Sequence, residues 1–121
     1  MIDEKKLFNI HWTDSYFESM TISKKRDSCD IDLFLEYEKK NHISICNCFC
    51  IYVSQKGFFI GNDTILDVKL LNESSLITKE RQLWVDSNIE LKELKICLNS
   101  GSEISCLLSN DSFLTISEVR L

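Results

Sequence analysis

The sequence is poor in glycine and in positive charge, and both shortages exclude classes of function. Only three glycines occur in 121 residues, so the chain lacks the glycine-rich loop that cradles phosphates, and we do not expect nucleotide chemistry. Fourteen Lys and Arg stand against 19 Asp and Glu, which gives a net charge of −5. This balance argues against direct binding of nucleic acid, because phosphate contacts need a basic surface. It is compatible with a basic protein partner.

Long apolar runs are also missing. The first eight residues, MIDEKKLF, lack the apolar core of a signal peptide, and no segment is long enough to span a membrane. We therefore expect a cytoplasmic protein without membrane contact, whose six cysteines are reduced. The composition, 44% hydrophobic and 27% charged, is ordinary for a folded domain. The length predicts one domain over residues 1–121 that buries roughly two-thirds of its unfolded surface.

The uncharged stretch from His42 to Ser54 is the centre of the expected fold. It contains neither Gly nor Pro and is dense in β-branched and aromatic residues, which favour a strand over a helix. Side chains alternate between the two faces of a strand, and here both faces are apolar. The pattern predicts a central strand covered on both sides. One face holds Ile43, Ile45, Phe49, Ile51 and Val53, and the other holds Cys46, Cys48, Cys50 and Tyr52.

Further alternating segments predict antiparallel strands around this one. They cover residues 16–23, 28–38, 58–60, 64–71, 94–98, 104–108 and 113–119, with polar turns between them. The apolar residues stand at odd positions up to Leu91 and at even positions from Leu94, which indicates a bulge or a break in the strand. Seven to nine short strands predict an all-β, mainly antiparallel fold, either a sandwich or a partly open barrel. In the segments 64–71, 94–98 and 104–108, the residues expected to point into the core are Leu66, Val68, Leu70, Leu94, Ile96, Leu98, Ile104, Cys106 and Leu108.

Residues 72–88 fit two patterns. A helical stripe that begins near Leu76 could be capped by Ser74 or Ser75. On the other hand, Ile77, Leu83 and Val85 share one face of a strand. We expect a loop or one short helical turn within 74–84 and then a strand at 82–86.

The clearest surface pattern lies in residues 28–38. Alternate positions from Cys29 to Tyr37 are apolar, and the positions between them form an acidic row that only an aromatic residue interrupts. One interpretation is the solvated face of a half-buried antiparallel strand. The other is a docking surface for a basic protein, where opposite charge speeds encounter and a buried aromatic ring supplies binding energy. The candidate binding residues are Asp27, Asp30, Asp32, Phe34, Glu36 and Glu38.

The alternate cysteines at 46, 48 and 50 suggest a metal site at first sight. Structural zinc usually takes Cys-x2-Cys loops, whereas alternate residues of a strand stand about 6.6 Å apart, too far for easy shared coordination. A thiolate nucleophile would need an electropositive surrounding, and the sequence offers none there. We therefore expect buried, reduced cysteines with no metal and no cofactor.

Two other classes of function remain open. A hydrolase could use His11 and Asp14 with Ser15, because a catalytic triad is recognised by geometry and not by order along the chain. The chain has only one further histidine, and no glycine-rich elbow accompanies Ser15. The alternative interpretation is that Asp14 and Ser15 bond to nearby backbone at the start of the first strand. A small ligand-binding barrel would place its pocket between the sheets near Tyr52, Trp84 and Phe113.

The segment His11–Ile22 resembles the Trp/His–Asp–Ser/Ala–x4–Ile pattern that opens several small β-rich bacterial immunity proteins. In those families an apolar strand with Cys or Phe follows, then an Ile-x-Asp-Val/Ile segment. Here Cys46–Val53 and Thr64–Val68 are similar. The likeness covers about half of the chain. It departs where many relatives carry His-Asp, because this chain has Trp12-Thr13-Asp14.

The resemblance implies an immunity protein of a polymorphic-toxin or contact-dependent growth-inhibition system. Such a protein is not an enzyme: it binds the C-terminal domain of its cognate toxin, often a basic nuclease, and blocks the active site or the approach of substrate. In this chain the acidic row would meet the basic residues with which the toxin holds nucleic-acid phosphates.

Overall fold

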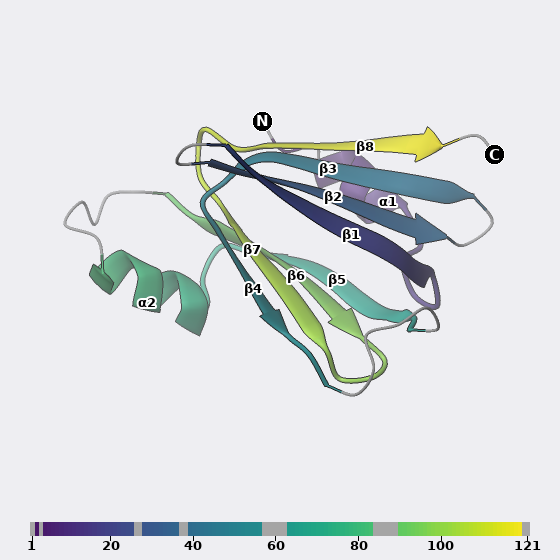
Figure 1. Cartoon of the computed structure of the whole chain (residues 1–121). Coiled ribbons are helices and arrows are strands. Elements are labelled where there is room, and N and C mark those ends of the chain that lie inside the picture. Colours follow the sequence, from purple (N-terminus) through teal and green to yellow (C-terminus); the bar gives the residue numbers. More distant parts are fainter. Residues whose placement is uncertain are drawn as a thin grey trace.

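The computed structural model describes residues 2, 4–25, 28–36, 39–56, 63–83 and 90–119. Within them, eight strands form two four-stranded antiparallel sheets (Figure 1). Sheet A has the order β1-β2-β3-β8 and consists of β1 (Tyr16–Lys25), β2 (Ser28–Glu36), β3 (Lys40–Cys48) and β8 (Phe113–Val119). Sheet B has the order β4-β7-β6-β5 and consists of β4 (Cys50–Ser54), β5 (Ile65–Leu71), β6 (Lys92–Leu98) and β7 (Glu103–Leu108). The helices are α1 (Glu4–Asn9) and α2 (Ser75–Leu83).

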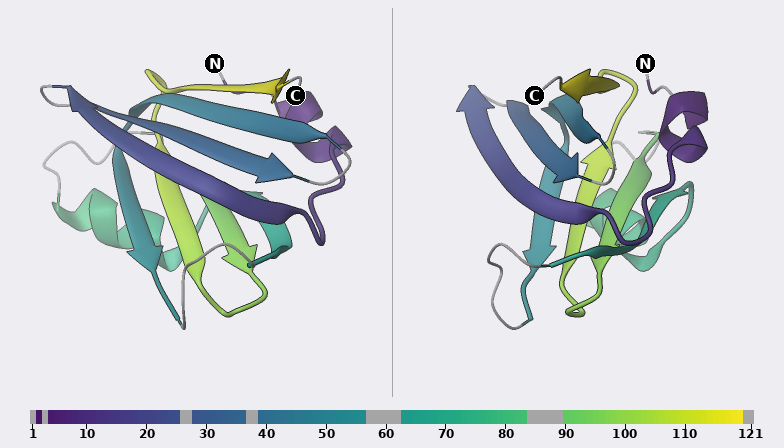
Figure 2. Two further views of the ribbon diagram at one scale, coloured as in Figure 1. Left: turned by 45° about the vertical axis from the view of Figure 1, so that its right-hand side comes forward. Right: turned by 90° about the vertical axis from the view of Figure 1, so that its right-hand side faces the viewer.

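The two sheets face each other, and the strands of sheet A run across those of sheet B (Figure 2). The strands form two separate hydrogen-bonded sheets that do not join into one closed barrel. The predicted all-β, mainly antiparallel sandwich is therefore confirmed. One core fills the space between them, because alternate positions of most strands are apolar and point inward. Its fully buried members include Ile31, Leu33 and Leu35 of β2, Ile43 and Ile45 of β3, Leu94 and Ile96 of β6, and Ile104 and Cys106 of β7.

The stretch 42–54 is not one strand covered on both sides, and that prediction is wrong. It divides into β3 of sheet A, which ends at Cys48, and β4 of sheet B, which begins at Cys50; Asn47, the last residue but one of β3, has φ 57°. Asn tolerates this left-handed conformation better than other non-glycine residues. The Asn47 amide N–H donates to Asp30 Oδ1 at 3.1 Å, and its side-chain Nδ2 donates to the Asp111 carbonyl at 3.2 Å. Asn47 thus lies in a bulge of β3, two residues before Phe49, where the chain passes from one sheet into the other.

The helix α1 is absent from the sequence-based predictions. It lies beside β8, where Ile2 forms a bridge with Leu114 of that strand (Figure 2). Leu7, at the centre of α1, is completely buried in the core, and the Trp12 indole Nε1 donates to the Leu7 carbonyl at 2.7 Å. The helix therefore covers the side of the core that sheet A leaves open beyond its last strand.

The helix α2 is longer than the single turn expected, and Gln82 and Leu83 belong to it and not to a strand. The expected strand at 82–86 is therefore wrong at these two residues, and residues 84–86 lie outside those described. Ser74 caps the helix as predicted, because its Oγ accepts from the Ile77 amide at 3.1 Å. Ile77 then packs with Leu107 on the outer face of sheet B. This contact with a distant strand favours a helix over a strand for residues 75–83, and the local sequence pattern does not reveal it.

A bulge in β5 overturns one prediction about side-chain direction. The pairing of β5 with β6 shifts between Ile65 and Asp67, so two residues of β5 occupy the space of one. Ile65 takes the inward position, and Leu66 points outward with 54% of its surface exposed. Val68 is buried as expected, and Leu70 is half-buried. The break expected before Leu94 is the start of β6, and the strand expected at 58–60 lies outside the described residues.

Candidate functional site

The described part of the acidic row lies on the outer face of sheet A. Ile31, Leu33 and Leu35 of β2 point into the core, so the residues between them point away from it. Glu36 is exposed, and the other three candidate residues are half-buried among their neighbours on the sheet. The remaining two candidates, Asp27 and Glu38, lie outside the described residues. The residues that the structure places together on this face are Asp30, Asp32, Phe34 and Glu36.

His42 completes the centre of this face and was not among the sequence-based candidates. It lies directly opposite Phe34 in the pairing of β2 with β3. The two rings stack with centroids 4.5 Å apart and planes 6° from parallel. The Nε2 atom of His42 lies 2.6 Å from Asp32 Oδ1. The short connection between β2 and β3 sets this contact, because a tight connection fixes which residues of two strands face each other.

A second missed pair extends the cluster to both neighbouring strands. Lys40 of β3 lies with its Nζ 5.3 Å from the centre of the Phe34 ring and 2.6 Å from Glu18 Oε1 of β1. A cation in this position is attracted by the face of the ring. The contacts thus run without interruption from Glu18 through Lys40, Phe34 and His42 to Asp32.

The electrostatic balance of the face is acidic. Four carboxylates, those of Glu18, Asp30, Asp32 and Glu36, surround one lysine and one histidine. Short hydroxyl side chains continue the cross-strand rows, because Thr21 faces Asp32 in β1 and Thr115 faces Ser44 in β8. Short neighbours leave the stacked rings accessible, and Figure 2 shows no described helix over this side of sheet A. The face can therefore receive a flat, positively charged surface.

The outer faces also hold the aromatic residues expected to line a pocket between the sheets. Tyr52 and Phe113 are 42% and 50% exposed, and packed aliphatic side chains fill the space between the sheets. The predicted pocket position is therefore wrong for both residues, and Trp84 lies outside the described residues. Among the residues that the structure describes, one cavity lies beside the N-terminal segment and another lies on the outer face of sheet B.

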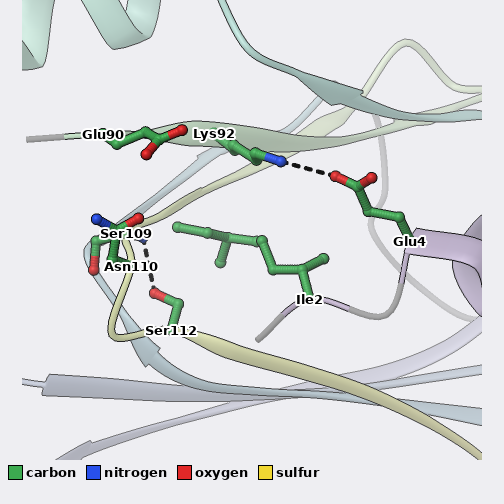
Figure 3. Close-up of a pocket in the computed structure, with 8 residues that line it drawn as sticks. Ile2, Glu4, Glu90, Lys92, Ser109, Asn110 and Ser112 are labelled. Carbon is green, nitrogen blue, oxygen red and sulfur yellow. Dashed lines mark hydrogen bonds and ion pairs between the residues drawn. The ribbon is translucent and has the colours of Figure 1, made fainter.

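The cavity beside the N-terminal segment has a volume of about 340 Å³ and is shown in Figure 3. Ile2 lies across its middle, and Lys92 is 2.8 Å from Glu4 Oε1 at its rim. On its other side the Ser109 amide donates to Ser112 Oγ at 3.0 Å. The contacts of Lys92 and Ser109 thus lie within the chain.

The candidate catalytic residues of a hydrolase lie in the turn before β1. Asp14 has φ 68°, its amide donates to the Ile65 carbonyl at 2.9 Å, and the Ser15 carbonyl accepts from the Ile65 amide at 2.9 Å. These bonds join the turn to the start of β5, in agreement with a structural role at the strand entrance. Ser15 is only 2% exposed, so no substrate carbonyl can reach its hydroxyl in this conformation.

The cysteines follow the expected packing only in part. Cys48 and Cys106 are buried in the core, whereas Cys46 is exposed on the outer face of sheet A. The hydrogen bond with Cys48, together with burial, raises the pKa of the Cys106 thiol well above its usual range. Burial and the nearby Glu80 carboxylate raise the pKa of the Cys50 thiol to about 12. No group of three potential metal ligands occurs among the residues that the structure describes.

Comparisons with models of protein families, with curated proteins and with solved structures find no match to this chain. No helix in the described ranges is long and apolar enough to cross a membrane.

Proposed function

We propose that this protein is an immunity protein that binds a basic toxin domain through the outer face of sheet A and so blocks the active or substrate-binding site of the toxin. The observation that supports this proposal is the cluster of Phe34 stacked on His42 within a ring of carboxylates. The partner is the C-terminal domain of a toxin, most simply a nuclease that cleaves RNA or DNA. The protein acts by occupying the toxin and performs no chemistry.

The cluster has the composition of a protein-binding hot spot. A half-buried aromatic ring at the centre supplies apolar contact area, and water is excluded around it when a partner covers the face. An arginine of the partner can stack on the rings and bond to the carboxylates at the same time. Glu36 is exposed, and no ion pair of this residue occurs within the described part of the chain, so its charge is available to a partner. Asp32 and Glu18 are already paired and hold the face in shape.

The acidic charge explains how binding would inhibit a nuclease. Such an enzyme holds its substrate through Lys and Arg that contact phosphates. The same side chains are the natural partners of the carboxylates on sheet A, so the toxin cannot bind the protein and nucleic acid with one surface. Complementary charge also accelerates encounter, because it steers the two molecules together.

The test begins with the C-terminal domain of a toxin encoded next to this gene. Co-expression of that domain with the protein should allow cells to survive, and expression of the domain alone should kill them. Equal killing with and without the protein would contradict the proposal.

The face is tested with purified components. We expect Phe34→Ala and Glu36→Lys each to weaken toxin binding about tenfold or more in isothermal titration calorimetry. The matched control is Asp67→Lys, a charge reversal on the outer face of sheet B, where the side chain is 51% exposed; it should leave the affinity unchanged. Wild-type affinity should fall with added salt, because exposed charges are screened. If the two sheet A variants bind like the wild type, the toxin uses another surface.

A further inference from the structure

A cavity of about 370 Å³ lies on the outer face of sheet B, next to the first turn of α2. Its lining includes the apolar side chains of Val53 of β4, Leu71 of β5 and Leu76 of α2, together with the hydroxyls of Ser54, Ser74 and Ser75. Its floor is polar and consists of Glu93 of β6 and Ser105 of β7. The cavity is on the opposite side of the sandwich from the proposed docking face, and the inference drawn from it does not depend on that function.

Glu93 is the unusual group of this cavity. It is 4% exposed, and its Oε2 accepts from Ser105 Oγ at 2.7 Å. Within the described residues, the Ser105 hydroxyl is the one hydrogen-bond donor shown for this carboxylate. A buried carboxylate with a single neutral donor is costly, because burial removes water that a hydroxyl replaces only in part. A ligand cation beside Glu93 would offset this cost.

The lysine that lines the cavity, Lys95, already contacts the second carboxylate of the lining. Lys95 follows Glu93 by two positions on the same face of β6, but its Nζ lies 3.5 Å from Glu103 Oε2 of β7. The cavity lining then holds two carboxylates and one ammonium group. The imbalance, located at a buried carboxylate, fits a ligand that carries one positive charge.

We propose that this cavity binds an alkylammonium group, a primary amine on a short apolar stem, with Glu93 as its counter-ion. The ammonium group has three N–H donors, which suit the carboxylate of Glu93 and the surrounding hydroxyls. The methylene stem packs against the apolar side chains of the lining, as lysine stems do on protein surfaces. Tyr52 donates to Glu80 of α2, and this bond holds the helix beside β4 and so keeps the wall of the cavity in place.

The alkylammonium group can belong to a free small amine or to a lysine side chain. The two sources share their chemistry and differ in what surrounds it. n-Butylamine hydrochloride is the probe for the free amine, and Nα-acetyl-lysine methylamide is the probe for a lysine in a chain. Saturable binding of the first alone assigns the site to free amines, and saturable binding of the second assigns it to a lysine of a partner; either result supports the site.

The experiment is a titration of the ¹⁵N-labelled full chain, followed by amide chemical shifts. We expect n-butylamine to shift the amides of Glu93, Ser105 and Leu76, and 1-butanol, its neutral analogue, to give no saturable shift. Glu93→Gln keeps the size and the bond to Ser105 but removes the charge, so it should weaken amine binding about tenfold or more. The matched control is Glu118→Gln, which removes an exposed carboxylate on sheet A and should change nothing.

A second variant keeps the test decisive if Glu93→Gln does not fold. Lys95→Met removes the cation that competes for the carboxylates of the cavity, and it should tighten amine binding about threefold. Equal shifts with butanol, an unchanged affinity in folded Glu93→Gln, weaker binding to Lys95→Met, or no saturation with either amine would each overturn the proposal.

Discussion

At the scale of single residues, Asn47 determines how the two sheets are connected. Its left-handed backbone, with φ 57°, lies in a bulge of β3 just before the strand ends at Cys48, and its side chain bonds to the Asp111 carbonyl in the turn before β8. One residue therefore sets the direction of the chain and fixes a turn that is distant in sequence.

We expect Asn47→Ala to destabilise the protein by about 1–2 kcal/mol, because alanine is strained at positive φ and loses the side-chain bond. Asn47→Gly loses the same bond but tolerates the backbone, so it should cost less. Urea unfolding of the three proteins measures the difference. If the alanine variant were as stable as the wild type, the backbone at this residue would have to be free to change.

A second residue-scale property is the link between Tyr52 and Glu80. The hydrogen bond to the Glu80 carboxylate, with burial as the second cause, raises the pKa of Tyr52 from 10.0 to about 12. Between these values the folded protein keeps a proton that the unfolded chain has lost. The stability from this bond is complete below pH 10 and is lost as the pH rises towards 12.

The corresponding prediction compares the wild type with Tyr52→Phe. The free energy of unfolding of the wild type should decrease above pH 10 more steeply than that of the variant. Below pH 10 the free energies of unfolding of the two proteins should change with pH in the same way. Urea titrations on both sides of pH 10 test this, and identical slopes above it would show that Tyr52 and Glu80 are not bonded.

At the scale of elements, α1 covers the core with one side chain. Leu7 is fully buried, and its neighbour Phe8 is 55% exposed. We expect Leu7→Ala to cost about 3 kcal/mol, since it leaves a cavity in the core, and Phe8→Ala to cost less than about 0.5 kcal/mol. Thermal and urea unfolding of both variants check this. Comparable losses would mean that the helix packs through a different face.

Strands could be predicted from the sequence where one face is buried and the other is exposed to solvent. Residues 28–36 alternate cleanly, and the structure places them in β2 with the predicted faces. The errors fall where contacts distant in sequence decide. Leu66 was misplaced because a bulge in β5 depends on its partner strand, and α2 was underestimated because Ile77 packs on residues of β7.

The candidate face was predictable only as a row within one strand. Asp30, Asp32, Phe34 and Glu36 could be grouped by alternation alone. His42 and Lys40 belong to the same cluster through the register of β2 with β3, and alternation within one segment carries no information about register. Glu18 required a third strand, so the cluster as a whole exists only after the sheet has formed.

At the scale of the whole molecule, the two outer faces differ in kind. The outer face of sheet A is open and carries aromatic rings among carboxylates, which suits a broad protein partner. The outer face of sheet B is partly covered by α2 and holds an enclosed carboxylate, which suits one small cationic group. The sandwich separates these surfaces by its core, so each can be occupied while the other is empty.

The place of β8 in sheet A has a consequence for how the chain is made. The strand β3 needs β8 as its neighbour, and Lys40 pairs there with Val119. A ribosome delivers β8 last, so β3 keeps an unsatisfied edge during most of synthesis. Pairing across so much intervening chain is slow, on a scale of milliseconds to seconds. Until then the nascent protein exposes an apolar strand edge, at which contacts with other chains can form.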